Sequence, residues 1–141
     1  PVNPNIKLYN HNMGSSTIGW YGTPGLVEAA SKDFPQSLAD VPVLLPTAHT
    51  AVRDRLDQWF EQRAIRPRVV GEFEDSALLK TFGASGMGIF PAAEWAHDDL
   101  LAHFSVQRLG PCEGVTEHFF AIGTEKKVLH PLVQRLLQPA I

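Results

Sequence analysis

The run of apolar residues from Val41 to Pro46 constrains the fold of this chain more than any other segment. Its sequence is Val-Pro-Val-Leu-Leu-Pro, with no polar or charged side chain in it. A strand with one face in water alternates apolar and polar residues, whereas a strand covered on both faces is apolar throughout. The run therefore predicts a buried strand of a parallel sheet.

The segment after this strand alternates between helix and strand patterns. Apolar residues at 52, 56, 59 and 60 recur with helical spacing, with charged residues between them. Residues 69–73 and 87–91 are typical of two further strands, and a second helix is expected from Asp75-Ser76 to about residues 83–86. The side chains of that helix expected to face inward are Ala77, Leu78, Leu79 and Phe82. Two consecutive β-α-β units with right-handed crossovers result, so the predicted fold class is α/β.

Shorter elements are expected on either side of this region. Before it, the patterns predict two short strands interrupted at residues 13–16 and a short helix at 26–32. After it, the expected elements are a helix over 92–104, strands at 106–109 and 118–122 either side of Gly110-Pro111, and an amphipathic terminal helix carried by Leu129, Leu132, Val133, Leu136 and Leu137.

Charge and cysteine content exclude several function classes. Fifteen acidic and twelve basic residues give a formal net charge of −3, which opposes binding of this chain to a phosphate backbone. The single cysteine, Cys112, excludes an intrachain disulfide and a CxxC redox pair, and fits a reducing compartment such as the cytoplasm. No apolar run approaches the ~20 residues of a membrane span. We therefore expect a soluble, cytoplasmic protein with no membrane partner.

The loop after the buried strand is the first candidate binding site, because ligands of open parallel sheets collect outside the carboxyl ends of the strands. It contains Thr47, His49 and Thr50, whose hydroxyls and imidazole lie at a helix N-terminus that favours an anion. The alternative is that Thr47 or Thr50 only caps the helix and that His49 lies on the surface.

The loop after the strand at 69–73 is the second candidate site. Asp75 or Ser76 is a suitable helix N-cap. Alternatively, Glu74 and Asp75 together hold a cation or an amine. The residues alone leave both interpretations open.

Metal-binding and catalytic motifs are weak in this sequence. The best group of metal ligands is His97, Asp98, Asp99 and His103, but it lacks HExxH spacing and a nearby third ligand, so a solvated helix face is expected. The stretch Gly83-Ala84-Ser85-Gly86 fails the GxSxG pattern, and no nucleotide-binding glycine motif follows. We expect no catalytic residue, no metal and no cofactor.

The order of these segments resembles the effector-binding region of LysR-type transcriptional regulators. The resemblance is carried by Val43-Leu44-Leu45-Pro46, by residues 68–73 with Asp75-Ser76, and by the stretch Gly83-Ala84-Ser85-Gly86-Met87-Gly88-Ile89-Phe90-Pro91. The last stretch is similar to the family's "aGlGia.lP" signature. Within the family, residues 9–11 and 66–78 are similar to regulators of sodium/proton antiporter genes.

The resemblance implies a fold like type-2 periplasmic binding proteins, in which two α/β subdomains joined by crossover strands hold a ligand between them. Residues 23–113 are then expected to form the second subdomain. Residues 1–22 are expected to be a hinge segment with a remnant of the first subdomain, and residues 114–141 a returning strand with a terminal helix. Because the sequence begins at Pro1 without Met, we expect the winged helix-turn-helix of such regulators to precede it.

Carried over by position, the resemblance implies effector contacts in both loops and in the crossover. The residues are Thr47, His49, Thr50, Phe73, Asp75, Ser76, His11 and Asn12. This chain departs from regulators of small carboxylates in the acidic residues Glu72, Glu74 and Asp75 beside the expected cleft. Because of these acidic residues, a cation is retained as an alternative effector.

The function implied is the non-enzymatic, effector-sensing part of a transcriptional activator. Its expected partners are a small-molecule or ion effector, a second copy of the chain, and DNA only through the absent helix-turn-helix. The alternative is an independent solute-binding module or an enzyme of similar α/β fold. A third interpretation is that open sheet edges serve mainly as a subunit contact.

Overall fold

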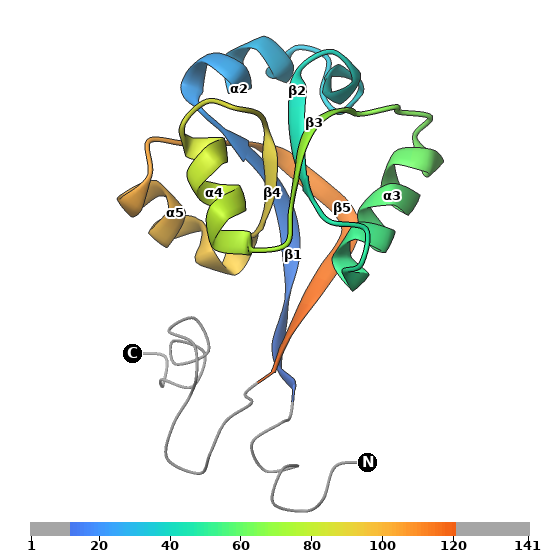
Figure 1. Ribbon diagram of the computed structural model, residues 1–141, viewed down its shortest axis with the longest axis vertical. Coiled ribbons are helices and arrows are strands. Elements are labelled where there is room, and N and C mark those ends of the chain that lie inside the picture. The colour runs from blue at the N-terminus through green and yellow to red at the C-terminus, as the bar shows by residue number, and fades with distance from the viewer. Residues whose placement is uncertain (1–11, 121–141) are drawn as a thin grey trace, which may run out of the picture. The chain divides into compact units, whose positions relative to one another are not determined.

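The computed structural model describes residues 12–120 of the chain (Figure 1). The chain divides into two compact units, one of residues 17–116 and the other of residues 1–16 with 117–141. The larger unit contains both candidate loops.

The sheet combines a parallel part with an antiparallel part. Strand β2 (Pro42–Pro46) pairs in parallel with β3 (Arg68–Phe73). Strand β4 (Phe90–Ala93) pairs antiparallel with β1 (Asn12–Gly22), which also neighbours β5 (Gln107–Phe120). The N–H of Leu44 donates to the carbonyl of Ile89 at 2.8 Å and links the two parts in parallel orientation. The predicted α/β class and the buried strand at 41–46 are therefore confirmed, while the antiparallel part was not anticipated.

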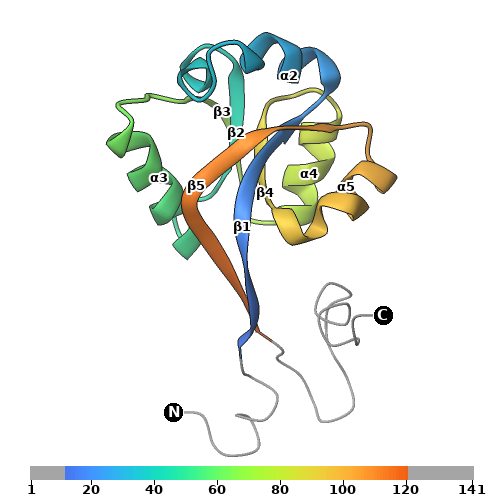
Figure 2. The ribbon, with the colours of Figure 1, turned by 180° about the vertical axis from the view of Figure 1, so that it is seen from behind.

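Helices cover both faces of this sheet. They are α2 (Pro24–Ser31), α3 (Ala51–Gln62), α4 (Ser76–Ala84) and α5 (His97–His103), with 3-10 turns η1 (Gln36–Ala39) and η2 (Glu94–Ala96). Along β2, Val43 and Leu45 face a core shared with α2 and α3, whereas Leu44 faces a core shared with α4 and α5. Figures 1 and 2 show the helices on opposite sides of the strands. The continuous apolar run is thus explained by burial on both faces.

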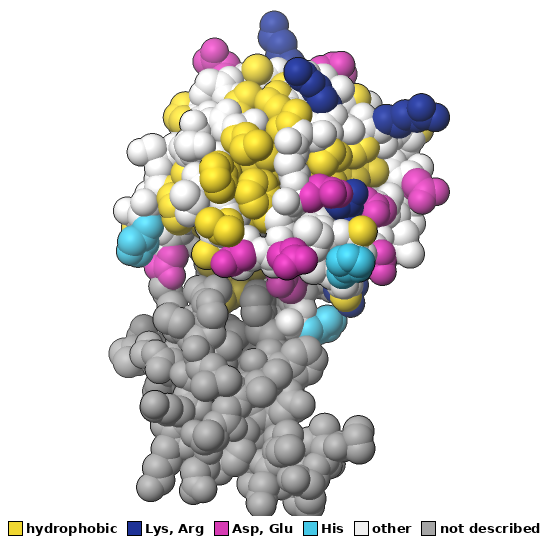
Figure 3. Space-filling view, viewed as in Figure 1, with side chains coloured by type: hydrophobic (Ala, Val, Ile, Leu, Met, Phe, Trp, Pro, Cys, Tyr) yellow, Lys and Arg dark blue, Asp and Glu magenta, His cyan; other side chains and the backbone are white. Residues whose placement is uncertain are grey.

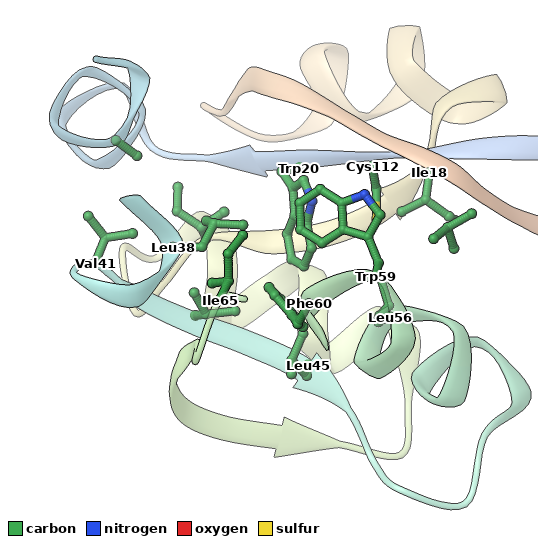
Figure 4. Close-up of a cluster of buried hydrophobic side chains, with 14 of the residues drawn as sticks. Ile18, Trp20, Leu38, Val41, Leu45, Leu56, Trp59, Phe60, Ile65 and Cys112 are labelled. Atoms are coloured by element: carbon green, nitrogen blue, oxygen red, sulfur yellow. The ribbon is translucent and has the colours of Figure 1, made fainter. Parts of the chain in front are cut away.

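Three aromatic rings from β1 and α3 meet at the centre of the core (Figure 4). The ring centroid of Trp20 lies 5.8 Å from that of Trp59 and 5.6 Å from that of Phe60. Trp59 and Phe60 come from the predicted apolar face of α3, together with the fully buried Leu56. The helical spacing read from the sequence therefore identified this face correctly.

Cys112 is buried in the same core, and we expect its thiol to be unreactive in the folded protein. Burial raises the pKa of Cys112 to about 12. In the unfolded chain the thiol ionises near pH ~8.5, so only there does the thiolate form readily. The free energy of unfolding therefore decreases as pH rises from ~8.5 towards the folded pKa, because only the unfolded chain releases this proton. Since Cys112 is the only cysteine, thiol labelling at pH 8 should proceed only as fast as unfolding, and rapid labelling of the native protein would contradict the burial.

Helix α4 corrects one expectation about which side chains face the core. Leu79 and Gly83 are buried, but Ala77 is exposed, and Leu78 and Phe82 are 49% and 43% exposed. A short helix touches a sheet along one narrow row of residues at i and i+4, so the neighbouring positions project away from it. Hydrophobic side chains accordingly gather on the face of the molecule that carries α4 and β3 (Figure 3).

Two glycine-containing stretches lie within strands instead of ending them. Strand β1 runs through Gly14, and β5 runs through Gly110 and Pro111 without interruption. A Cβ at Gly110 would lie 2.5 Å from the ring of Phe34. This glycine is therefore required by close packing and not by a turn.

The segment from 87 to 104 also differs from expectation at its boundaries. Strand β4 begins at Phe90 and continues to Ala93, and α5 begins only at His97. The expected helix at 129–137, like strand residues 121 and 122, lies outside the described residues. None of the helices in the part of the chain that is described has the length and apolar content to cross a bilayer.

Candidate ligand site at the carboxyl ends of the parallel strands

The two candidate loops meet at the carboxyl ends of β2 and β3. The N–H of Thr47, just after β2, donates to the carbonyl of Phe73, the last residue of β3, at 3.1 Å. This bond continues the parallel pairing by one step beyond the strands. It thereby holds side by side two segments that are 26 residues apart in the sequence, at Thr47 and Phe73.

Thr50 organises the first loop as the N-cap of α3. Its hydroxyl accepts a hydrogen bond from the Arg53 N–H at 3.2 Å and donates to the Thr47 carbonyl at 3.0 Å. Thr47 is half-buried, and His49 is exposed beside it. The capping role considered for Thr50 is therefore present, while contact of Thr47, His49 and Thr50 with an effector stays a prediction.

Asp75 organises the second loop in the same way. Its carboxylate accepts a hydrogen bond from the Ala77 N–H at 2.7 Å and caps α4. Ser76 is exposed at the first turn, and the half-buried ring of Phe73 stacks on Phe82 with centroids 5.3 Å apart. Asp75 is therefore the helix N-cap that the first of the two interpretations of this loop predicted. Contact of Phe73, Asp75 and Ser76 with an effector stays a prediction.

The crossover residues of the predicted site are not both placed. His11 lies outside the described residues. Asn12 opens β1, and its side chain is not described. Their expected position beside the cleft stays a prediction.

Arg53 joins β2 and β3 where they lead into the two loops, and the sequence analysis missed it. Its Nη1 donates to the Pro46 carbonyl at 2.7 Å and to the Glu72 carboxylate at 2.6 Å. Its Nε donates to the Asp57 carboxylate at 2.9 Å. Only 14% of the Arg53 side chain is exposed, against 48% for each of the two acidic side chains. The spacing of Arg53 and Asp57 at i and i+4 was the one signal in the sequence, and it resembles an ordinary surface pair.

The electrostatics of Arg53 keep it charged. Burial lowers its pKa, but the hydrogen bonds to Glu72 and Asp57 and the charges of both carboxylates outweigh burial, so the pKa of Arg53 lies above its ordinary value. Because Arg53 pairs with Glu72, the acidic character expected beside the cleft falls mainly on Glu74 and Asp75, which are exposed.

A third polar group follows β4 and was also missed. Because Ile89, which precedes β4, pairs in parallel with Val43, the carboxyl end of β4 lies at the same edge of the sheet as the two loops. There the Glu94 carboxylate accepts from the Thr17 hydroxyl at 2.7 Å and from the Arg108 Nε at 2.5 Å. No local pattern marks this group, since Thr17 and Glu94 lie 77 residues apart.

The histidines considered as metal ligands have other contacts. Nδ1 of His97 lies 3.0 Å from the hydroxyl of Tyr21, and Nδ1 of His103 lies 3.0 Å from the Asp99 carbonyl. Burial, with a smaller contribution from Glu94, raises the pKa of Tyr21 to about 12, so the hydroxyl stays protonated at neutral pH. Within residues 12–120, no three His, Cys, Asp or Glu side chains converge as a metal site would require.

Comparison with known proteins identifies the family. The LysR substrate binding domain matches residues 4–140, so this chain belongs to that family. It is 35% identical over 129 residues to the transcriptional activator protein NhaR of Escherichia coli K12, covering 92% of this chain and 42% of NhaR. It is 38% identical over 102 residues to the nitrogen assimilation regulatory protein nac of the same organism, covering 60% of this chain and 33% of that protein. The resemblance to LysR-type regulators read from the motif order is confirmed, and the chain spans less than half the length of these relatives.

Solved structures support the fold. The effector binding domain of QuiR in complex with shikimate superposes with a TM-score of 0.63, at 16% identity, over 96% of this chain and 63% of that one. At this identity the likeness concerns the fold alone. It confirms the expected architecture of a LysR-type effector-binding domain, which is that of type-2 periplasmic binding proteins.

Proposed function

We propose that this chain is the effector-sensing region of a LysR-type transcriptional activator. Family membership supports the class, and the contact between Thr47 and Phe73 supports the site, because it aligns two loops at the sheet edge where ligands of such folds collect. Effector binding biases a cleft or subunit arrangement, and the bias passes to a DNA-binding domain elsewhere in the regulator. The chain itself performs no catalysis in this proposal.

The effector we propose first is a small cation such as sodium. Two observations support this choice: the similarity to regulators of antiporter genes, and the exposed carboxylates of Glu74 and Asp75 beside the loops. A small carboxylate is the second candidate, since the QuiR domain of similar fold was solved with shikimate and two helix N-termini face this edge.

Titration tests the sensing of these ligands. The chain is titrated with sodium chloride, lithium chloride and shikimate at constant ionic strength, with choline chloride as the balancing salt. Trp95 follows β4 at the same edge of the sheet, so tryptophan fluorescence is a suitable signal. A saturable response to one ligand is expected, and a flat signal with all three from a folded protein counts against ligand sensing.

The partners of the complete regulator belong to the same proposal. They are operator DNA, bound through a helix-turn-helix, and a second copy of the regulator, in the cytoplasm. The alternative is an independent solute-binding module. The reading frame upstream of Pro1 distinguishes the two hypotheses. A helix-turn-helix there supports the regulator, and a secretory signal supports the solute-binding module.

The double substitution Thr47→Ala with Ser76→Ala should weaken the effector response without unfolding the domain. Each change removes one hydroxyl from the sheet edge, and two lost hydrogen bonds to a ligand correspond to roughly tenfold weaker binding or more. Ser31→Ala with Thr81→Ala is the matched control, because both hydroxyls are exposed and bond only to carbonyls of their own helices. An unchanged dissociation constant in the first double variant would remove these two side chains from the site.

A further inference from the structure

Arg53 contacts both strands that lead into the candidate loops through one nitrogen of its side chain. Its Nη1 reaches the Pro46 carbonyl, next to Thr47, and the Glu72 carboxylate, next to Phe73. Its own backbone N–H donates to Thr50, the cap of the first loop. The backbones of the two loops are joined by the 3.1 Å hydrogen bond from the Thr47 N–H to the Phe73 carbonyl.

The geometry of these contacts requires a guanidinium group. Nε is held by Asp57 on the same helix, so the planar fork is oriented before Nη1 meets Pro46 and Glu72. A lysine ammonium carries the same charge but has one nitrogen at the end of a flexible chain, and it cannot reproduce this fixed orientation.

We propose that Arg53 is a positioning residue that couples the two loops, so that movement of one loop on ligand binding displaces the other. The inference rests on the proposed ligand site and goes beyond it, since it assigns the coupling to a side chain that need not touch the ligand. Without Arg53, the loop after β2 keeps its helix cap but loses its side-chain connection to β3.

Amide hydrogen exchange of the chain tests the coupling without any ligand. The Thr47 amide reports the contact between the loops, because it donates to Phe73. The Leu44 amide, which donates to Ile89 from the same strand, reports the opening of the sheet as a whole. In Arg53→Lys, exchange at Thr47 should accelerate about tenfold relative to Leu44, the effect of losing roughly one hydrogen bond to a charged group.

Arg55→Lys is the matched control. Arg55 lies on the same helix and donates to the Thr116 carbonyl at 3.3 Å, away from both loops. Its substitution should leave the ratio of exchange at Thr47 and Leu44 unchanged. Equal acceleration of both amides in Arg53→Lys would show that Arg53 contributes only to general stability, and it would overturn the proposal, as would an unchanged Thr47 rate.

Ligand titration separates this inference from the proposed function. If the parent chain responds to sodium, lithium or shikimate, Arg53→Lys should bind that ligand about tenfold more weakly than Arg55→Lys does, and equal affinities would overturn the coupling role. If the parent responds to none of them, the proposed sensing of these ligands fails, while the exchange at Thr47 still decides whether Arg53 couples the loops.

Discussion

Replacing Leu45 with aspartate should prevent the domain from folding at neutral pH. Leu45 is fully buried in β2, in the core that also contains Trp59 and Phe60. The substitution removes a buried leucine and places an unpaired carboxylate there, at a combined cost of more than about 5 kcal/mol. This is comparable with the whole stability of a typical domain, ~5–15 kcal/mol.

Two variants serve as controls for this effect. Val70→Asp introduces the same charge on the neighbouring strand at a side chain that is 41% exposed, so its cost should stay near ~1 kcal/mol. Leu45→Met keeps the apolar volume and should cost less than ~1.5 kcal/mol. Urea denaturation followed by circular dichroism measures all three. A cooperative unfolding transition of Leu45→Asp at the parental midpoint would show that β2 is not buried on this face.

Replacing Gly83 with alanine should destabilise the domain although alanine favours helices. Gly83 lies in the last turn of α4, and a Cβ there would come within 2.1 Å of the ring of Phe90. Phe90 is fully buried, so the ring has little room to move. Helix propensity alone predicts a gain of ~1 kcal/mol, whereas overpacking of a core costs ~1–3 kcal/mol. We expect packing to prevail, with a net loss of ~1–2 kcal/mol.

Gly25 provides a matched control in another helix. It lies in the first turn of α2, and nothing lies within 4 Å of a Cβ built there. Gly25→Ala should therefore stabilise the domain by ~0.5–1 kcal/mol. Opposite signs for the two glycine substitutions in thermal unfolding are the expected outcome. Stabilisation by Gly83→Ala would contradict the close approach of α4 to Phe90, and Gly83→Ala combined with Phe90→Leu should recover part of the loss.

Local patterns predicted much of the fold. The burial of β2 on both faces, the buried row of α3 and the parallel pairing of β2 with β3 agree with the sequence analysis. Each of these depends on spacing along a single element, since a helix repeats every ~3.6 residues and a strand every 2. The exposed side chains of α4 were wrongly predicted because a short apolar segment does not show how wide a row its neighbours will cover.

The candidate site was predicted as two loops but not as a connected structure. Thr47 was selected because it follows a strand, and Phe73 through the resemblance to the family; the structure joins them through a backbone hydrogen bond. The sequence analysis placed charged residues between the apolar positions of this helix without singling out Arg53, although most of the Arg53 side chain is buried. The partner that draws it inward, Glu72, lies 19 residues away.

By itself, the sequence determined the α/β class, the order of the β-α-β units and the family, because these depend on residue types at fixed short spacings. Only the tertiary structure decided that Arg53 joins β2 and β3 beside the loops, that Glu94 meets Thr17 across 77 residues, and that Gly83 is required by Phe90. Such contacts depend on how strands pair and how closely a helix approaches the sheet, which no local spacing specifies.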